Sequence, residues 1–215
     1  MNLRDAVLSR HLAPRRLLRQ PPDIQTRYDE RRLIMLVQKI HHVAYRCKDA
    51  LQTARWYEQH LDMKLVLCIA EDTVPSTGEA DPYMHIFLDA GQGNILAFFE
   101  LPTQPEMGRD PNTPVWTQHL ALEVGSMDEL LAAKQRLQNA GIDVIGPTDH
   151  ALFQSIYFFD PNGHRLELAC NTSSPKMLAA LDAVKWDMLE EWNQTRKAPK
   201  HAAWMHDGRY KEMFQ

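Results

Sequence analysis

The stretch Asp149–Ala169, DHALFQSIYFFDPNGHRLELA, decides the fold that we expect for this chain. Its centre, Ser155–Phe159, is an apolar run typical of a strand. Asp160–Gly163 follows as a turn, because proline fixes φ and glycine tolerates positive φ. The run His164–Ala169 returns as a second strand and completes a hairpin. It carries an acid, Glu167, and a buried carboxylate is costly unless it is paired, as a metal ion would pair it.

The hairpin closes the second of two similar segments. The first segment reads as a strand over Leu36–Cys47 and a helix over Asp49–His60, followed by three strands within 63–101. A linker rich in proline and glycine covers 103–114. The segment therefore has the order βαβββ.

The same order returns after the linker. Thr117–Val124 reads as a strand, and Met127–Ala140 as a helix that Gly141 ends. Ile142–Ile145 reads as a further strand, and the hairpin follows. The chain is thus predicted to be an internal repeat, which determines its architecture.

We predict an α+β fold in which two paired βαβββ modules form one domain with a cleft between curved sheets. The domain is expected over 36–172, with modules at 36–102 and 116–171. The segment 173–215 is expected to add a helix and a tail, with aromatic side chains of the tail packed on the outer sheet face. Residues 1–35 form an arginine-rich extension that we expect to be dispensable for chemistry.

Composition excludes several classes of function. The net charge is −4, so nucleic acid is not an expected partner. No apolar run approaches the ~20 residues that a membrane span needs. The three cysteines are far apart and form no zinc or redox motif, as expected for a cytoplasmic protein with free thiols.

The repeat also places candidate ligands at matching points. The run His42-Val43-Ala44-Tyr45 matches His119-Leu120-Ala121-Leu122, and Phe99-Glu100-Leu101 matches Leu166-Glu167-Leu168. Because strand side chains alternate, the apolar residues can pack on the helices while each His or Glu faces the cleft. Such nitrogen and oxygen ligands suit Fe(II), Mn, Ni or Zn.

A single histidine at a strand start is more often structural than a metal ligand. Four such residues in matching places favour a metal site over this structural reading. The other histidines of the domain and tail have no such match, or point toward the helix side, and we expect them to be surface or core residues: His41, His60, His85, His164, His201 and His206.

On these residues the chain resembles the vicinal oxygen chelate superfamily, over about 38–170. The superfamily includes glyoxalase I, extradiol ring-cleaving dioxygenases, and fosfomycin and bleomycin resistance proteins. The resemblance implies a divalent metal held between two modules by His42, His119 and Glu167, with Glu100 at a fourth position that some branches use. It also implies a homodimer and a small-molecule substrate with two adjacent oxygens.

The closing stretch resembles the extradiol dioxygenase signature more specifically. Thr148-Asp149-His150 is followed after five residues by Ile156-Tyr157, then by Asp160-Pro161-Asn162-Gly163 and Glu167. This resemblance implies Fe(II) and a catechol-like substrate, with Tyr157 hydrogen-bonded to a substrate oxygen and His150 as a proton donor or acceptor. The structural alternatives are an aromatic that fills the strand and a loop histidine.

Glu100 supports a different reading. Four ligands of the His/Glu/His/Glu kind resemble glyoxalase I, a lyase in which Ni or Zn acts as a Lewis acid and a glutamate moves the proton. A third reading is a drug-sequestering protein similar to the bleomycin-binding members. We favour the dioxygenase, with the glyoxalase-type lyase as the alternative.

Overall fold

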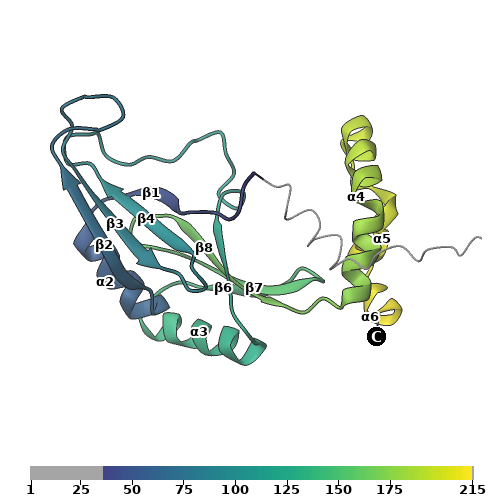
Figure 1. Cartoon of the computed structure of the whole chain (residues 1–215). Helices are drawn as coiled ribbons and strands as arrows, with labels where there is room; N and C mark the ends of the chain where they lie inside the picture. The colour runs from purple at the N-terminus through teal and green to yellow at the C-terminus, as the bar shows by residue number, and fades with distance from the viewer. Residues whose placement is uncertain (1–35, 215) are drawn as a thin grey trace, which may run out of the picture. The chain divides into compact units, whose positions relative to one another are not determined.

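The computed structural model describes residues 36–214, so the expectation for residues 1–35 lies outside the described part. The elements treated below belong to one compact unit, His41–Gln215. Its two four-stranded sheets confirm the paired βαβββ fold (Figure 1). The elements of the first module are β1 (Val43–Cys47), α2 (Ala50–Leu61), β2 (Lys64–Glu71), β3 (Tyr83–Asp89) and β4 (Ile95–Glu100).

The second module repeats the order and is followed by a helical segment. Its elements are β5 (Leu120–Glu123), α3 (Met127–Asn139), β6 (Ile145–Asp149), β7 (Phe153–Phe159) and β8 (Arg165–Asn171). The helical segment holds α4 (Pro175–Thr195), η1 (Lys200–Ala202), α5 (Ala203–His206) and α6 (Tyr210–Met213). The strand orders are β1-β4-β3-β2 and β5-β8-β7-β6, and only the pairs β1–β4 and β5–β8 are parallel.

Both module helices begin at side-chain caps that the sequence supplies. Asp49 accepts a hydrogen bond from Gln52 N at 2.7 Å at the start of α2. Ser126 accepts from Glu129 N at 3.2 Å at the start of α3, and the Glu129 carboxylate accepts from the backbone N–H of Gly125. Such caps satisfy backbone N–H groups that the helix leaves unpaired, which is why the predicted helix bounds hold to within a residue or two.

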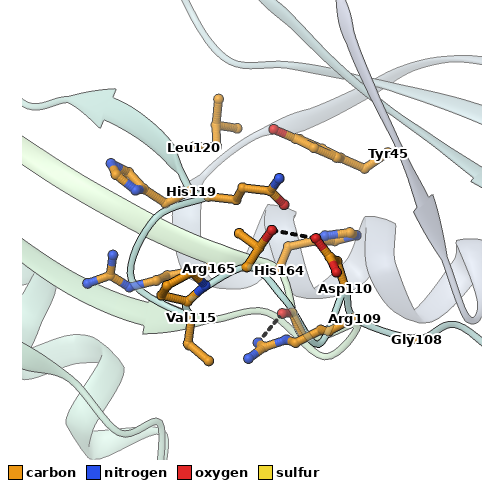
Figure 2. A pocket seen from close by; sticks show the side chains of 13 residues that line it. Tyr45, Gly108, Arg109, Asp110, Val115, His119, Leu120, His164 and Arg165 are labelled. Carbon is orange, nitrogen blue, oxygen red and sulfur yellow. Dashed lines mark hydrogen bonds between the residues drawn. The ribbon is translucent and has the colours of Figure 1, made fainter. Parts of the chain in front are cut away.

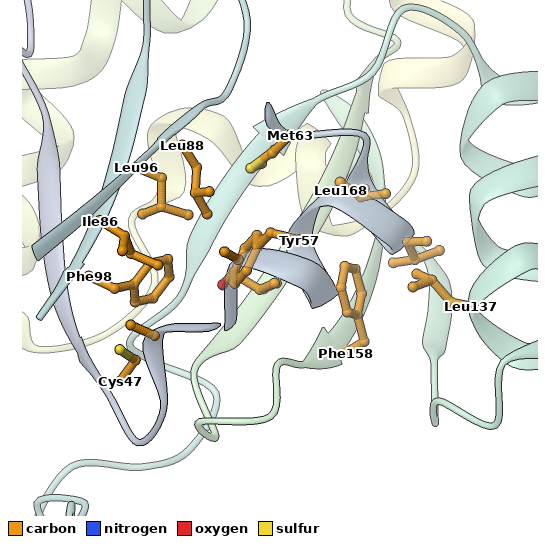
Figure 3. Close-up of a cluster of buried hydrophobic side chains, with 14 of the residues drawn as sticks. Cys47, Tyr57, Met63, Ile86, Leu88, Leu96, Phe98, Leu137, Phe158 and Leu168 are labelled. Carbon is orange, nitrogen blue, oxygen red and sulfur yellow. The ribbon is translucent and has the colours of Figure 1, made fainter. Parts of the chain in front are cut away.

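The helices α2 and α3 lie on one face of the sheets. The core fills the space between these helices and the sheets (Figures 1 and 3). Tyr57 of α2 and Phe158 of β7 are completely or almost completely buried there. The Tyr57 hydroxyl donates to Asp160 Oδ2 at 3.1 Å in the turn of the second module. The modules therefore share one core, with α2 packed against the β7–β8 hairpin.

The opposite face of the first sheet is open. Leu67 and Ile69 of β2 pair with Phe87 and His85 of β3, and their exposed fractions are 49% and 37%. Ala44 of β1 is exposed as well. Apolar side chains are therefore exposed to solvent on this face of the first sheet.

Three strands differ from their predicted ranges by three residues or more. β1 and β5 start at Val43 and Leu120, later than expected, and β6 covers Ile145–Asp149 rather than Ile142–Ile145. The Gly-Pro pair in β6 has the sequence features of a turn, but it forms a bulge against β7. A Cβ on Gly146 would stand 2.5 Å from the carbonyl oxygen of Ser155, so only glycine allows this close approach.

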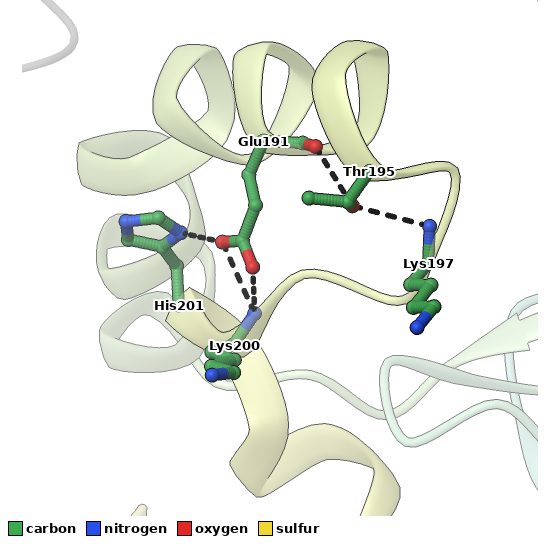
Figure 4. Close-up of polar contacts among 5 residues, drawn as sticks. All are labelled: Glu191, Thr195, Lys197, Lys200 and His201. Atoms are coloured by element: carbon green, nitrogen blue, oxygen red, sulfur yellow. Dashed lines mark hydrogen bonds and ion pairs between the residues drawn. The ribbon is translucent and has the colours of Figure 1, made fainter.

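The C-terminal segment confirms the predicted helix and adds short helices. Ser174 caps α4, and proline occupies its first turn. Glu191 holds the following chain: its carboxylate pairs with His201 Nδ1 at 2.8 Å and accepts from Lys200 N, and its backbone oxygen accepts from the Thr195 hydroxyl (Figure 4). No helix in residues 36–214 is long and apolar enough to cross a membrane.

The tail does not pack as predicted. Its aromatic residues Trp204 and Phe214 cluster with Met177 of α4 and with Leu152, rather than spreading over the outer face of a sheet. Leu152 is part of the turn between β6 and β7, so the helical segment reaches the second module at that turn.

Candidate metal centre

His119 and Glu167 meet on the face of the second sheet that is turned away from the core. His119 Nε2 lies 2.8 Å from Glu167 Oε2, and the Glu167 side chain is only 3% exposed. Glu167 pairs across the sheet with Ala121, two residues after His119. The Ser155 hydroxyl donates to the other carboxylate oxygen, Oε1. This buried carboxylate is therefore satisfied on both oxygens.

The arrangement of these two side chains fits a metal ion. Two ligand atoms at right angles, each about 2.1 Å from a shared metal, stand about 3 Å apart. The observed separation of 2.8 Å between nitrogen and oxygen is that of a direct hydrogen bond, and it lies close to the spacing of two metal ligands as well. A neutral imidazole and a carboxylate also form the donor pair that Fe(II), Mn, Ni and Zn accept.

Tyr157 and His150 lie beside this pair. Tyr157 is directly opposite Glu167 in the β7–β8 ladder, and its hydroxyl is 2.8 Å from His150 Nε2. Burial raises the pKa of Tyr157, and the Glu167 carboxylate raises it further. The two residues that the dioxygenase signature implies are thus in contact with each other and next to a proposed ligand.

The turn that carries His150 is tightly built. Ala151 has a positive φ of 66°, and its N–H donates to Asp149 Oδ1 at 2.7 Å. The backbone N–H of His150 donates to the carbonyl of Phe153, which closes the turn. Asp149 also accepts from the Tyr210 hydroxyl at 2.9 Å, so helix α6 holds the turn as well.

His42 lies in a different group of side chains. Its Nδ1 is 2.8 Å from His41 Nδ1, and its ring centroid is 5.9 Å from that of Phe87 and 6.2 Å from that of His85. Among residues 36–214, no three side chains of the metal-binding types gather at one point. A single copy therefore does not bring His42 to the His119–Glu167 pair, and the expected cleft with all ligands in one chain is not formed.

Glu100 is not the structural counterpart of Glu167. Ala44 pairs with Ala97 in the first module, as Ala121 pairs with Glu167 in the second. Ala97 therefore occupies the matching position, and the equivalence that we expected for Glu100 was wrong.

The Glu100 carboxylate is engaged at the start of a helix. Its Oε2 accepts a hydrogen bond of 2.7 Å from Ala50 N, the first residue of α2. It lies two residues after the buried Phe98, on the same side of β4 as that core residue. The structure thus gives Glu100 a helix-capping role apart from the His119–Glu167 pair.

Sequence reasoning missed Ser155, whose hydroxyl donates to Glu167. Its place two residues before Tyr157 on the same strand face was the available signal.

His85 is a buried residue, in agreement with the expectation of a surface or core histidine. It is 8% exposed, stacks on Phe99 with ring centroids 3.5 Å apart, and has no hydrogen-bond partner at Nε2. Burial lowers the pKa of His85, and His42 lowers it further.

A cavity of about 260 Å³ has His119, but not Glu167, in its wall (Figure 2). Two arginines, Arg109 and Arg165, line it together with Asp110. In Figure 2 the side chains of His119 and Arg165 extend in the same direction. The cavity thus places positive charge next to the proposed ligands.

The sequence model of the glyoxalase/bleomycin resistance protein/dioxygenase superfamily matches residues 39–168, more than half of the chain. The chain belongs to this superfamily. Superfamily membership agrees with the two βαβββ modules.

Relatives of the superfamily share the domain but not the whole chain. The uncharacterized protein YwkD of Bacillus subtilis (strain 168) is 29% identical over 138 residues, which cover 62% of this chain and 98% of YwkD. A glyoxylase/bleomycin resistance protein/dioxygenase domain from Frankia sp. EAN1pec is 23% identical, with a TM-score of 0.50, over 63% of this chain and 98% of that structure. A glyoxalase family protein from Enterococcus faecalis is 25% identical, with a TM-score of 0.47, over 63% of this chain and 99% of that structure.

The C-terminal helices lie outside the segment that the superfamily model matches. Through Tyr210 and the cluster around Leu152 they nevertheless contact the turn that carries His150. The superfamily domain of this chain therefore has an added helical segment at the edge of its candidate site.

Proposed function

We propose that this chain is a metal-dependent enzyme that acts on a small molecule with two adjacent oxygens, and that the reaction is extradiol-type ring cleavage of a catechol-like substrate. The observation that carries the proposal is the joint placement of the His119–Glu167 pair and the Tyr157–His150 pair on one sheet face. Fe(II), when bound by His42, His119 and Glu167, would supply the redox chemistry that cleavage by dioxygen needs.

The number of available ligands favours this reaction over a glyoxalase-type one. With Ala97 in place of a fourth ligand, three protein ligands leave three coordination positions for reactants. The glyoxalase alternative with Ni or Zn needs Glu100 at the metal, whereas its carboxylate accepts from the N–H of Ala50.

The residues of the chain would divide the remaining work. The Tyr157 hydroxyl is placed to hydrogen-bond a substrate oxygen beside Glu167. His150, 2.8 Å from that hydroxyl, would accept or return a proton through Tyr157.

We also propose that a second copy of the chain completes the site by supplying His42. His42 is exposed on the first module, and the open apolar face that includes Leu67 and Ile69 lies on the same sheet. In a two-fold dimer each copy gives the same surface to the other, so two equivalent sites would form, each with His42 from one copy and His119 and Glu167 from the other.

Oxygen uptake tests the reaction. The protein is purified without air, loaded with Fe(II) and given a panel of catechols in an oxygen-electrode cell. We expect uptake with a coloured ring-opened product, and loss of both in Tyr157→Phe and His150→Ala. Absence of uptake with every catechol, together with conversion of a methylglyoxal–thiol adduct by Ni-loaded protein, would establish the lyase instead.

Mixing two inactive variants tests the shared site. His42→Ala and Glu167→Ala should each lose metal binding, but a mixed dimer would regain one intact site of its two. Random subunit exchange makes about half of the dimers mixed, so roughly a quarter of the wild-type metal content should return. No recovery, with exchange verified by native mass spectrometry, would show that the site is not shared.

A further inference from the structure

Arg109 and Arg165 are two guanidinium groups without a carboxylate partner. In the described part of the chain, no ion pair involves either residue. Arg165 donates through Nη1 to the Trp116 carbonyl at 2.7 Å, and Arg109 donates through Nη2 to the Gly163 carbonyl at 2.6 Å. A guanidinium has five N–H donors, so most of the donors of each arginine remain available.

Aromatic rings hold both guanidinium groups in place. The Arg165 Cζ atom lies 4.0 Å from the centroid of the Tyr157 ring, and the Arg109 Cζ atom lies 4.8 Å from that of Phe159. Tyr157 and Phe159 are two residues apart on one face of β7, about 7 Å from each other. Each guanidinium group is therefore held against an aromatic ring on the same face of β7.

These arginines stand beside the proposed ligands. Arg165 lies two residues before Glu167 in β8 and so shares its face of the sheet. Both arginines line the cavity of about 260 Å³ that His119 also borders (Figure 2). A substrate held at His119 and Glu167 would thus extend toward positive charge.

The acid in this cavity does not neutralise the arginines. The Asp110 carboxylate accepts from the Thr113 hydroxyl and from Asn112 N, and these hydrogen bonds lower its pKa. Both of its oxygens are thus engaged within its own loop. Two guanidinium groups face one carboxylate that is already bonded elsewhere, and the cavity keeps a net positive charge.

We propose that Arg165, assisted by Arg109, forms an oxyanion subsite that recognises a carboxylate or phosphate group on the substrate. This inference rests on the proposed function and narrows it, because the substrate would carry an anionic group in addition to its two adjacent oxygens. Guanidinium groups match the geometry of such anions, since they donate two parallel hydrogen bonds.

A purely structural role for Arg165 is the alternative that the experiment must separate. Its bond to the Trp116 carbonyl uses a single N–H, and a glutamine amide can supply one as well. Arg165→Gln therefore removes the positive charge and the paired N–H donors of the guanidinium group, while keeping one N–H donor for the Trp116 carbonyl. The matched control is Arg136→Gln, an exposed arginine that pairs with Asp62 on the helix side.

The first arm uses metal-free protein, so it does not depend on any reaction. Benzoate and inorganic phosphate are titrated separately while the arginine side-chain N–H signals are followed by NMR. We expect saturable shifts with at least one of the two anions, weakened about 10-fold by Arg165→Gln and unchanged by Arg136→Gln. Binding of benzoate indicates a carboxylate subsite, and binding of inorganic phosphate indicates a phosphate subsite. Equal affinity of the wild type and Arg165→Gln for the anion would overturn the proposal.

The second arm uses Zn-loaded protein, which binds catechols without oxidising them. Calorimetry compares catechol with 3,4-dihydroxybenzoate, which adds a carboxylate. If the first arm shows a carboxylate subsite, wild type should prefer the acid about 10-fold, and Arg165→Gln should bind both ligands alike. If the protein binds catechol but does not prefer 3,4-dihydroxybenzoate, the carboxylate subsite is refuted and the proposed function is not. If it binds neither ligand although benzoate binds in the first arm, the proposed function is refuted and the subsite is not.

Discussion

Glu167 is a carboxylate at 3% exposure whose two oxygens are each engaged, one by Ser155 and one by His119. The serine fixes the carboxylate orientation before any metal arrives. When such a side chain orients a metal ligand, its removal typically lowers metal affinity about 10- to 100-fold.

Ser155→Ala should therefore weaken metal binding about 10-fold or more while the protein stays folded. Competition with a coloured chelator measures the affinity, and the thermal midpoint reports the fold. Ser126→Ala is the matched control: it removes the α3 cap and should cost about 1 kcal/mol of stability without a change in metal affinity. Equal metal affinity in Ser155→Ala and wild type would contradict the orienting role.

Glu100→Ala should leave metal content unchanged and lower stability by about 1 kcal/mol, because α2 loses a charged acceptor at its N-terminus. Atomic absorption on the metal-loaded variant and a urea unfolding curve check the two parts of this expectation. A loss of metal in this variant would return Glu100 to the ligand set.

The error over Glu100 has a physical cause. In the run Ile95–Glu100, apolar side chains occur on both faces of the strand, so alternation gives no register. Letter matching then aligned Glu100 with Glu167. The face on which Glu167 lies could be predicted, because the buried Leu166 and Leu168 flank the acid and mark the opposite face. The ladder with β1, which the sequence does not state, was needed to identify Ala97 as the matching position.

Among the elements, the β6–β7 turn depends on the helical segment that follows the domain. Tyr210 of α6 donates to Asp149, and Leu152 packs with Met177 and Trp204. His150 lies between these two anchored residues. The α6 contact is thus positioned to fix the His150 ring against Tyr157.

Tyr210→Phe should loosen this turn, since Asp149 would keep only its bond to Ala151 among the contacts described above. We expect faster hydrogen–deuterium exchange at residues 149–153. We also expect kcat to fall by a factor of about 5, with little change in KM. Tyr83→Phe, in the other sheet, serves as the control and should change neither quantity. Unchanged exchange in Tyr210→Phe would mean that the turn is rigid without α6.

Long elements were predictable and short ones were not. The helices α2, α3 and α4 have caps and enough turns for their periodicity to be recognised. By contrast, α5 and α6 have four residues each, too few for any period to appear, and tertiary contacts with α4 determine them.

For the molecule as a whole, one shared core supports both modules, and the other face of the first sheet stays open. Cys47 and Cys170 belong to that core, while Cys68 is exposed on β2. Burial raises the pKa of the Cys47 thiol to about 11, which further lowers its reactivity.

Native protein should consequently react rapidly with a thiol reagent such as DTNB at Cys68 alone. All three cysteines should react once the core is unfolded in guanidinium chloride. Absorbance of the released dye gives the count, and Cys68→Ser should abolish the fast phase. Fast labelling of a second thiol in native protein would contradict the shared core.

The sequence predicted both modules and their order, but not the way in which one copy arranges them. Repeats of βαβββ specify each sheet through local pairing, whereas the contact between modules depends on a few side chains such as Tyr57 and Asp160. The hydrophobic pattern is the same whether a module of the same chain or one of a second copy covers the open face. The sequence therefore could not predict that His42 lies apart from His119.

The alanine at position 97 also has a genetic consequence. Alanine and glutamate codons can differ by a single base, and Ala97 occupies the place in the first repeat where Glu167 stands in the second. One point mutation would therefore give both repeats the same donors. In the proposed metal centre that change would add a fourth protein ligand, so a single base separates a centre with three open reactant positions from one with two.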